Sequence, residues 1–307
     1  MKEQPRRRVL LLTTGGTVAC RQTAQGLSPA LGADAIAALL PASDGICALE
    51  PHELMQLDST DLTTADRMAI AHAVWERRAA YDGFVIAHGT DTLAHTAALL
   101  HHVLPRIDRP VVVTGSMLPL GAPRSDAPAN LVNALRVAAA GVGGVFVVMG
   151  RRIIWGNHAV KYHSAAADAF VSADAPLAGT VDADGTVRLA LPLHPAGEPA
   201  FVSEIDPHVL LVRLTPDLPP SFFAALGGYP KVILEAFGAG GVPQRLEAAV
   251  RALIEGGTRV YIASQCVEGG VDLDRYAVGQ RAAALGAVSL GARTTEDALA
   301  AIMCGEL

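Results

Sequence analysis

The run Gly83-Phe84-Val85-Ile86-Ala87-His88-Gly89-Thr90-Asp91-Thr92 joins two kinds of local pattern. Its first five residues form a continuous apolar segment, which is typical of a strand buried on both faces. The next five place a glycine among polar residues and suit a loop, and the alanine- and leucine-rich segment Leu93–Val103 then predicts a helix. The run therefore predicts one strand–loop–helix unit of a parallel sheet.

The same order of patterns recurs through the first two-thirds of the chain. Further strands are expected at Val9–Thr13, Pro110–Val113 and Gly144–Met149, and a further helix at Asn130–Ala140. Apolar strands that alternate with helices form a parallel sheet covered by helices on both faces. We therefore predict a larger N-terminal parallel-sheet α/β domain.

A second, smaller domain is expected after a polar linker. The 307 residues exceed what one compact core usually holds. Proline, glycine and polar residues accumulate at 191–207, which predicts a linker between an N-terminal domain at 1–190 and a C-terminal α/β domain at 208–307. In the C-terminal domain, strands are expected at Val209–Leu214, Val232–Phe237 and Val260–Ser264, and helices at Gln244–Glu255 and Glu296–Met303.

The composition argues against several function classes. The net charge of -6 and the pI near 5.9 leave no electrostatic footprint for nucleic acid or anionic membranes. The apolar run after Arg6–Arg8 stops at Thr13, short of the roughly 7–15 apolar residues of a signal peptide. The four cysteines lie far apart, at Cys20, Cys47, Cys266 and Cys304. We therefore expect a cytoplasmic protein with reduced thiols, no zinc site or disulfide framework, and no nucleic-acid or membrane partner.

Hydroxyl groups and glycines concentrate where the predicted strands end. In open parallel sheets, ligands bind beyond the carboxyl ends of the strands. Glycines there let backbone N–H groups approach a ligand, and a neighbouring hydroxyl can act as the nucleophile of an acyl transfer. The loops in question contain Thr14, Gly15, Gly16 and Thr17, then Gly89, Thr90, Asp91 and Thr92, then Thr114, Gly115 and Ser116. The pattern favours a small-molecule hydrolase with a hydroxyl nucleophile.

A hydroxyl nucleophile needs a base, and two candidates stay open. His88 follows an apolar strand, where a histidine is more often a hydrogen-bonded structural residue. Lys161 is one of only three lysines among 24 cationic residues, and a lysine can lose its proton where an arginine effectively cannot. Asp91 could orient Lys161 or accept a substrate ammonium group. Each motif also has a structural interpretation, as a capped helix start or a solvent-facing lysine.

These motifs resemble those of the bacterial-type asparaginase/glutaminase family, and the chain is most similar to its cytoplasmic (type I) members. The resemblance covers nearly the whole chain. It is carried by Thr14–Ala19, Leu57–Asp61, Asp82–Thr92, Pro110–Ser116, Arg124–Asp126, Asn130–Ala134 and Lys161, and in the smaller domain by Phe237–Gly240, Ser264–Cys266 and Tyr276–Ala277.

The resemblance implies a role for each matching residue. Thr17 would attack the side-chain amide carbon of L-asparagine and form a β-aspartyl ester, while Thr90, Asp91 and Lys161 would form a second hydroxyl–carboxylate–base set. Which threonine attacks first stays open. The substrate-binding set would be Ser59, Thr60, Gly89 and Ser116, with backbone N–H groups near Thr90 and Ser116 as oxyanion donors. Family members are dimers of intimate dimers, so a homodimer or homotetramer is expected. The resemblance implies no metal or organic cofactor.

The sequence departs from the family pattern at three positions that bear on the site. Thr60 stands after Ser59, where the family usually has a glutamine or a similar residue. Leu27 stands where many members place a tyrosine whose hydroxyl contacts the nucleophile, and Tyr162 or Tyr276 could substitute for it or be structural. Gly241 stands where many members carry an asparagine in the glycine loop of the smaller domain. Leu27 bears on acylation, because a hydrophobic side chain cannot relay a proton. Gly241 removes a polar contact and bears on substrate affinity and on tolerance of glutamine.

Three other functions remain as alternatives to an asparaginase. A mixed asparaginase–glutaminase, or a hydrolase of another small ω-amide, would use the same residues. A nucleotide-binding Rossmann protein is disfavoured, because Thr14–Thr17 lacks the G-x-G-x-x-G spacing and the Walker lysine. A non-catalytic amino-acid-binding module would explain the missing loop tyrosine.

Overall fold

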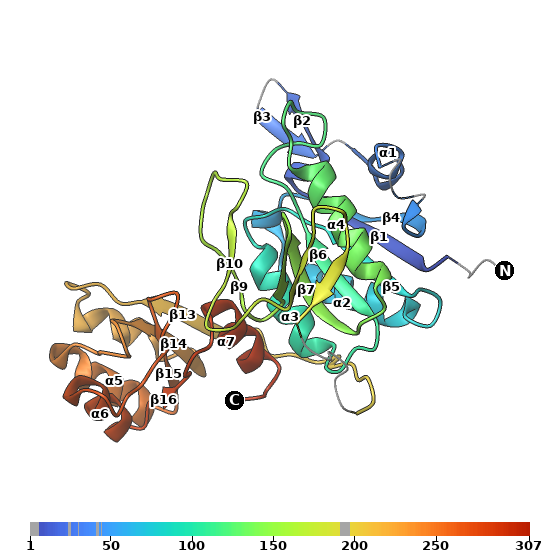
Figure 1. The fold of residues 1–307 in the computed structure, drawn as a ribbon. Helices are drawn as coiled ribbons and strands as arrows, with labels where there is room; N and C mark the ends of the chain where they lie inside the picture. The colour runs from blue at the N-terminus through green and yellow to red at the C-terminus, as the bar shows by residue number, and fades with distance from the viewer. Residues whose placement is uncertain (1–5, 24–25, 30, 41–42, 44, 191–196) are drawn as a thin grey trace. The chain divides into compact units, whose positions relative to one another are not determined.

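The computed structural model describes residues 6–23, 26–29, 31–40, 43, 45–190 and 197–307, with the backbone alone described for 20–23 and 26–29 (Figure 1). The chain divides into two compact units. The first comprises Met1–Ser172 and Pro176–Ser203, and the second comprises Ala173–Ala175 and Glu204–Leu307.

The first unit is built on an eight-stranded sheet with the order β12-β11-β8-β7-β6-β5-β1-β4. Its parallel strands are β1 (Arg8–Gly15), β4 (Ala48–Leu57), β5 (Gly83–Ala87), β6 (Pro110–Thr114) and β7 (Gly144–Met149). Three antiparallel strands extend the sheet, namely β8 (Arg152–Trp155), β11 (Gly179–Val181) and β12 (Val187–Leu189). The sheet is therefore mixed, whereas the sequence predicted a parallel one. The two residues between β7 and β8, with Gly150 at a φ of 59°, allow only a hairpin reversal.

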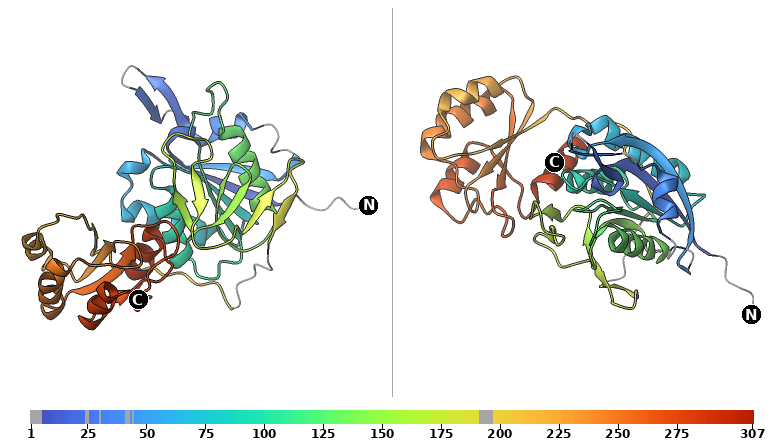
Figure 2. Two further views of the ribbon diagram at one scale, coloured as in Figure 1. Left: turned by 60° about the vertical axis from the view of Figure 1, so that its left-hand side comes forward. Right: turned by 90° about the horizontal axis from the view of Figure 1, so that it is seen from above.

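Helices cover both faces of this sheet (Figure 2). The helix α4 (Ala127–Ala139) packs with α1 (Ala33–Ala38) in a core that contains Val9, Val85 and Val112. On the opposite face, α3 (Leu93–Val103) contacts β6 and β7 and packs against α2 (Thr64–Arg77). Close packing requires small residues here, since a Cβ on Gly83 would lie 2.2 Å from the carbonyl oxygen of Ala138.

Two hairpins extend from this framework. The 3₁₀ turn η1 (Thr17–Ala19) leads into the hairpin β2 (Cys20–Thr23) and β3 (Gly26–Pro29). The second hairpin pairs β9 (Ala159–Lys161) with β10 (Phe170–Ser172), and Lys161 lies opposite Phe170 in its register.

The predicted linker at 191–207 falls partly outside the described residues, at 191–196. Its part at 197–203 packs on the first unit, where the Phe201 ring stacks on Trp75 with centroids 5.6 Å apart. The N–H groups of Ala200 and Val202 donate to the carbonyl oxygens of Pro105 and Val103. A large aromatic residue in a polar segment gains burial by this docking, so residues 197–203 belong to the first unit.

The second unit is a four-stranded parallel sheet with helices. Its strands β13 (Val209–Arg213), β14 (Lys231–Ala236), β15 (Arg259–Ser264) and β16 (Val288–Ser289) lie in sequence order. Its helices are α5 (Glu247–Glu255), α6 (Ala277–Ala284) and α7 (Thr295–Met303). It also contains the 3₁₀ segments η4 (Pro220–Leu226) and η5 (Gln244–Leu246), and the first unit contains η3 (Ser59–Asp61). The hydroxyl of Thr294 accepts a bond from the N–H of Asp297 and caps α7.

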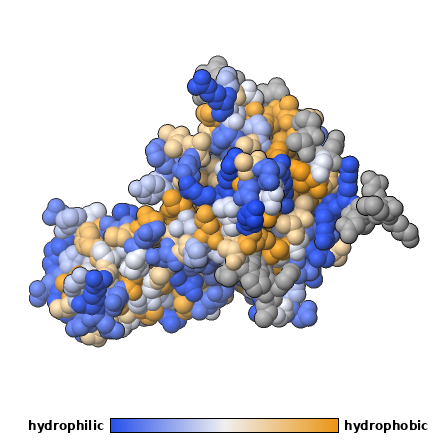
Figure 3. All heavy atoms as spheres, in the orientation of Figure 1, coloured by the Kyte–Doolittle hydropathy of each residue, from blue (hydrophilic) through white to orange (hydrophobic). Residues whose placement is uncertain are grey.

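The surface is of mixed polarity. On the face drawn in Figure 3, hydrophilic and hydrophobic residues alternate over both units. Large apolar side chains exposed in the first unit include Leu57, Leu118 and Tyr162. Within the described residues, no helix combines the length and the apolar character needed to cross a membrane.

Candidate active site

The site lies at the reversal in strand order of the first sheet. The chain adds β4 on one side of β1 and then crosses to add β5, β6 and β7 on the other side. Ligands bind at such a reversal because the loops that leave the carboxyl ends of the strands diverge there. The loops after β1, β4, β5 and β6 carry all of the predicted site residues except Lys161.

Glycines let three of these loops meet almost backbone to backbone. A Cβ on Gly16, which has a φ of 72°, would lie 2.3 Å from the Cα of Gly89. A Cβ on Gly89 would lie 2.6 Å from the hydroxyl oxygen of Ser59. Any side chain at Gly16 or Gly89 would therefore push the loops apart. This contact brings Thr17, at the start of η1, beside the loop that carries Thr90.

A fourth loop joins from β6. A Cβ on Gly115 would lie 2.5 Å from the carbonyl oxygen of His88 and 3.1 Å from the methyl carbon of Thr90. The hydroxyl of Ser116 is fully buried and donates to the carbonyl oxygen of Leu118, 2.7 Å away. The side chain of Ser116 therefore shapes its own loop, and its backbone N–H is the group that remains for a ligand.

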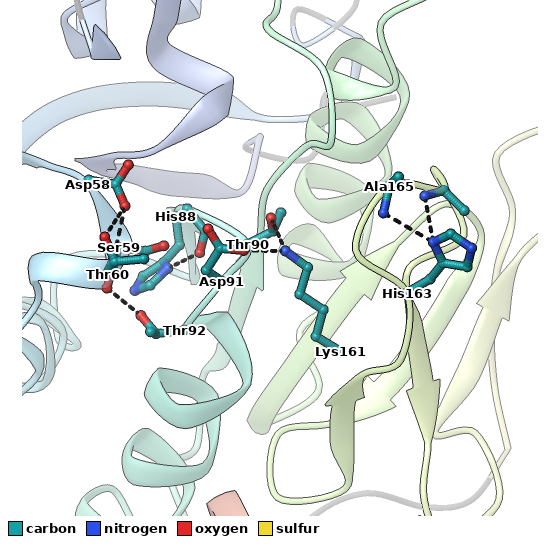
Figure 4. A network of polar contacts seen from close by, with 12 residues as sticks. Asp58, Ser59, Thr60, His88, Thr90, Asp91, Thr92, Lys161, His163 and Ala165 are labelled. Atoms are coloured by element: carbon teal, nitrogen blue, oxygen red, sulfur yellow. Dashed lines mark hydrogen bonds and ion pairs between the residues drawn. The ribbon is translucent and has the colours of Figure 1, made fainter. Parts of the chain in front are cut away.

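Lys161 reaches the loop after β5 from the β9–β10 hairpin (Figure 4). Its Nζ lies 2.9 Å from the hydroxyl oxygen of Thr90 and 2.5 Å from Oδ1 of Asp91. The lysine side chain is 16% exposed and that of Asp91 is 59% exposed. The lysine contacts Oδ1 of this largely exposed side chain, so one carboxylate can hold the lysine and still meet a second cation through Oδ2.

The loop after β4 is fixed by capping bonds. Asp58 is the N-cap of the 3₁₀ turn η3, and it accepts bonds from both the N–H and the hydroxyl of Thr60. Ser59 is only 2% exposed, and its carbonyl oxygen accepts a 2.7 Å bond from the hydroxyl of Thr92 (Figure 4). The hydroxyl of Thr60 is thus engaged within its own turn, while that of Ser59 faces Gly89.

His88 is placed as a structural residue. It is fully buried, with Nδ1 2.6 Å from the carbonyl oxygen of Gly89 and Nε2 2.9 Å from the hydroxyl oxygen of Thr96. Burial is the largest of the effects that lower the pKa of His88 to about 4, and the positive charge of Arg67 acts in the same direction. Because both ring nitrogens are engaged, His88 has none left to take a proton from a threonine hydroxyl.

Several residues of the site were not predicted from the sequence. The carboxylate of Asp126 accepts bonds from the N–H groups of Met117 and Leu118, and Nδ2 of Asn130 donates to the carbonyl oxygen of Gly115. Asp126 and Asn130 lay within the recognised motifs, but nothing local to them indicates that their partners are in the loop after β6. A polar pair that opens a helix after a strand could have served as a signal.

The departures at Leu27 and Gly241 lie in different units of the chain. Leu27 pairs with Gln22 in the β2–β3 hairpin, but its side chain lies outside the described residues. Gly241 belongs to the second unit, where its N–H donates to the carbonyl oxygen of Phe237 at 2.7 Å. Among the described residues, no group of three or more His, Cys, Asp or Glu side chains is placed to hold a metal ion.

Family models match both units of the chain. The model for the N-terminal domain of asparaginase matches residues 8–193, and that for the C-terminal domain of glutaminase/asparaginase matches residues 208–305. The chain belongs to the asparaginase family.

Several known proteins are similar to this chain over nearly its full length. An L-asparaginase of Thermococcus kodakarensis is 39% identical, with 96% of this chain and 92% of the relative covered. Its solved structure superposes with a TM-score of 0.91 over 97% of this chain and 92% of that chain. L-asparaginase 1 of Escherichia coli K12 is 34% identical over 93% of this chain and 88% of its own. A structure described as a probable cytoplasmic L-asparaginase from Campylobacter jejuni is 26% identical, with a TM-score of 0.83 and coverage of 98% and 95%.

Proposed function

We propose that this member of the asparaginase family is an L-asparaginase, an amidohydrolase that converts L-asparagine to L-aspartate and ammonia. The observation that carries the proposal is the contact of Lys161 with both Thr90 and Asp91. The loop of Thr90 and Asp91 packs directly against the loop of Thr17. Two hydroxyls, a lysine and a carboxylate at one edge of a sheet suit a two-step acyl transfer. The names of the similar proteins favour asparagine as the substrate.

Thr17 is the proposed nucleophile. Its oxygen attacks the side-chain amide carbon of the substrate, the carbon–nitrogen bond breaks, and ammonia leaves with the hydroxyl proton. The product of this step is a β-aspartyl ester on Thr17. Water then attacks the ester carbon, breaks its bond to the Thr17 oxygen and releases aspartate.

Lys161 is the proposed base. Only its neutral amine can accept a proton, and the contact between Nζ and the Thr90 hydroxyl is the route by which the Thr90 proton would reach it. Thr90 and Lys161 then activate the water of the second step or assist the first attack. Asp91 holds Lys161 in place with one carboxylate oxygen.

Backbone and side-chain groups around Gly89 are proposed to hold the substrate. The N–H groups of Thr90 and Ser116 would stabilise the oxyanion that forms at the amide carbon. The hydroxyl of Ser59 would bind the α-carboxylate, and the second oxygen of Asp91 would bind the α-ammonium group. Thr60 would stabilise the turn that carries Ser59, because its hydroxyl donates a hydrogen bond to Asp58.

We further propose a homodimer or homotetramer that acts in the cytoplasm on a small-molecule substrate. The similarity to the Campylobacter jejuni protein, which is described as a probable cytoplasmic L-asparaginase, supports the location. Sedimentation of the purified protein at micromolar concentration tests the assembly, and a stable monomer would contradict it.

The function is tested by ammonia release from purified protein, with L-asparagine and L-glutamine assayed side by side across concentration. Turnover of asparagine with little turnover of glutamine is expected. Comparable rates on both amides would point to a mixed asparaginase–glutaminase. Folded protein that releases ammonia from neither would overturn the proposal in favour of a binding module or another ω-amide.

A further inference from the structure

We propose that Arg67, Thr96 and His88 form a hydrogen-bond relay that orients and polarises the peptide group between Gly89 and Thr90, so that the N–H of Thr90 becomes a stronger oxyanion donor. The inference rests on the proposed function, in which that N–H faces the developing negative charge. It assigns positioning roles to three residues that do not touch the substrate.

The donors and acceptors of the relay are consistent from end to end. The Nε–H group of Arg67 donates to the hydroxyl oxygen of Thr96 at 3.2 Å. The single proton of that hydroxyl is then free to donate to Nε2 of His88 at 2.9 Å. Nδ1 of His88 carries the remaining ring proton and donates to the carbonyl oxygen of Gly89 at 2.6 Å. Because a carbonyl oxygen can only accept, Nδ1 of His88 must carry the ring proton. In a neutral ring Nε2 is then the acceptor, so the Thr96 hydroxyl donates to it.

The relay ends on the peptide group that bears the proposed oxyanion donor. The carbonyl oxygen of Gly89 and the N–H of Thr90 belong to one planar peptide unit and point in opposite directions. A bond that fixes the carbonyl therefore also fixes the N–H. A donor on the carbonyl oxygen draws electron density through the amide, which makes the N–H a better donor in turn. Among the described residues the N–H of Thr90 has no hydrogen-bond partner, so it remains available to a ligand.

Burial strengthens the effect of each bond. His88 and Thr96 are completely buried, and Arg67 is partly buried. No carboxylate among the described residues forms an ion pair with Arg67. Its positive charge is therefore not neutralised by a contacting anion and can polarise the hydrogen bonds of the relay. The low pKa of His88, caused by burial and by Arg67, keeps the ring neutral and preserves the acceptor at Nε2. In Figure 4, His88 is seen between Ser59 and Thr90.

The test compares steady-state kinetics of Arg67→Met, Arg67→Lys and Thr96→Val, with Arg77→Met as the matched control. Arg77 lies on the same helix and donates to the carbonyl oxygen of Ala73 within it. Arg67→Met and Thr96→Val are each expected to lower kcat by roughly tenfold with little change in KM, since the lost interaction strengthens only in the transition state. Arg67→Lys keeps the charge and should recover part of the loss, and Arg77→Met should match the wild type.

A double variant separates a relay from two independent defects. If the residues act in one chain, Arg67→Met adds little to the loss in Thr96→Val. Additive losses, a rise in KM with unchanged kcat, or wild-type kinetics in Arg67→Met would each overturn the proposal. Thermal unfolding of every variant shows whether a loss of activity reflects loss of fold, and the nearly isosteric Thr96→Val carries the test if Arg67→Met unfolds.

One measurement tests the relay without using activity. In protein labelled with ¹⁵N-histidine, His88 should show a protonated Nδ1 and an unprotonated Nε2, and Thr96→Val should change that pattern. The opposite tautomer in the wild type would overturn the relay even if asparagine is hydrolysed. If the wild type releases no ammonia from asparagine, the proposed function is wrong. The expected tautomer would then support the hydrogen bonds of the relay, and its role in catalysis would be overturned with the function.

Discussion

The two threonines of the site lie in loops of opposite character. Thr90 is 5% exposed, and its hydroxyl is held by Lys161, which is itself held by Asp91. Thr17 is half-buried at the start of a single 3₁₀ turn, and its hydroxyl has no hydrogen-bond partner among the described residues. A nucleophile must change its bonding during the reaction, whereas a proton path must keep its geometry. The difference therefore favours Thr17 as the attacking residue and Thr90 as part of the base.

The largest effect is expected from removing the proposed nucleophile. Thr17→Ala should lower kcat by at least about a thousandfold, because no acyl-enzyme can form. Asparagine binding, measured by calorimetry, should remain largely intact, since none of the proposed substrate-binding groups is removed. Full turnover by Thr17→Ala would reverse the assignment of the two threonines.

Removing the proposed base should lower kcat by less than removing the proposed nucleophile. Lys161→Met keeps most of the length of the side chain but deletes the amine, and kcat should fall by about 10²–10⁴-fold. The expected signature is a fall in kcat together with a KM that changes little. If Lys161→Met retains wild-type kcat, the link between Thr90 and Lys161 is structural only.

A smaller fall in kcat is expected from loosening the loop that carries the backbone N–H of Ser116. The amide of Asn130 donates to the carbonyl oxygen of Gly115, in the peptide unit that bears the Ser116 N–H, and it accepts a bond from the N–H of Gly150. Asn130→Ala should lower kcat by roughly tenfold and destabilise the fold by about 1–3 kcal/mol, the usual cost of an unsatisfied buried group. The control is Asn133→Ala on the same helix, whose side chain donates to the carbonyl oxygen of Gly150 instead. Equal losses of kcat in both variants would show that only helix packing matters.

A different predicted effect concerns stability in acid and not catalysis. Burial lowers the pKa of both His88 and His95 to about 4. The unfolded chain takes up protons on these rings below about pH 6.5, whereas the folded chain does so only near pH 4. Each ring therefore contributes stability that is complete above about pH 6.5 and is lost as the pH falls toward 4, by up to about 3 kcal/mol for each ring.

His95 provides the means to check this, because it lies outside the proposed machinery. Urea unfolding at pH 7.5 and at pH 4.5 should show a smaller loss of stability for His95→Gln than for the wild type. An unchanged difference between the two pH values would show that His95 does not remain neutral in the folded protein.

The sequence predicted those parts of the fold that are periodic and buried. The strand Gly83–Ala87 and the helix Leu93–Val103 have the predicted bounds, because an apolar run and an alanine-rich segment meet at a polar loop. The strand Ala48–Leu57 was not predicted, since it is a half-exposed edge strand that contains proline, histidine and glutamate. The antiparallel strands β11 and β12 have three residues each and are too short to show a pattern.

The site was predictable as a set of residues but not as a set of contacts. Thr90, Asp91 and Lys161 were named from the motifs, and the structure brings their polar atoms together. The bond from Arg67 to Thr96 joins residues on two different helices, so no local pattern contains it. The bonds of Asp126 and Asn130 to the loop after β6 likewise depend on how α4 packs on the sheet.

The most direct test of the account is to trap the covalent intermediate. Wild-type protein and Lys161→Met would be mixed with saturating asparagine, quenched in acid within the first turnover, digested and analysed by mass spectrometry. The account predicts a β-aspartyl ester on the peptide that contains Thr17 in at least the wild type. An ester on the peptide that contains Thr90, with Thr17 unmodified, would contradict it.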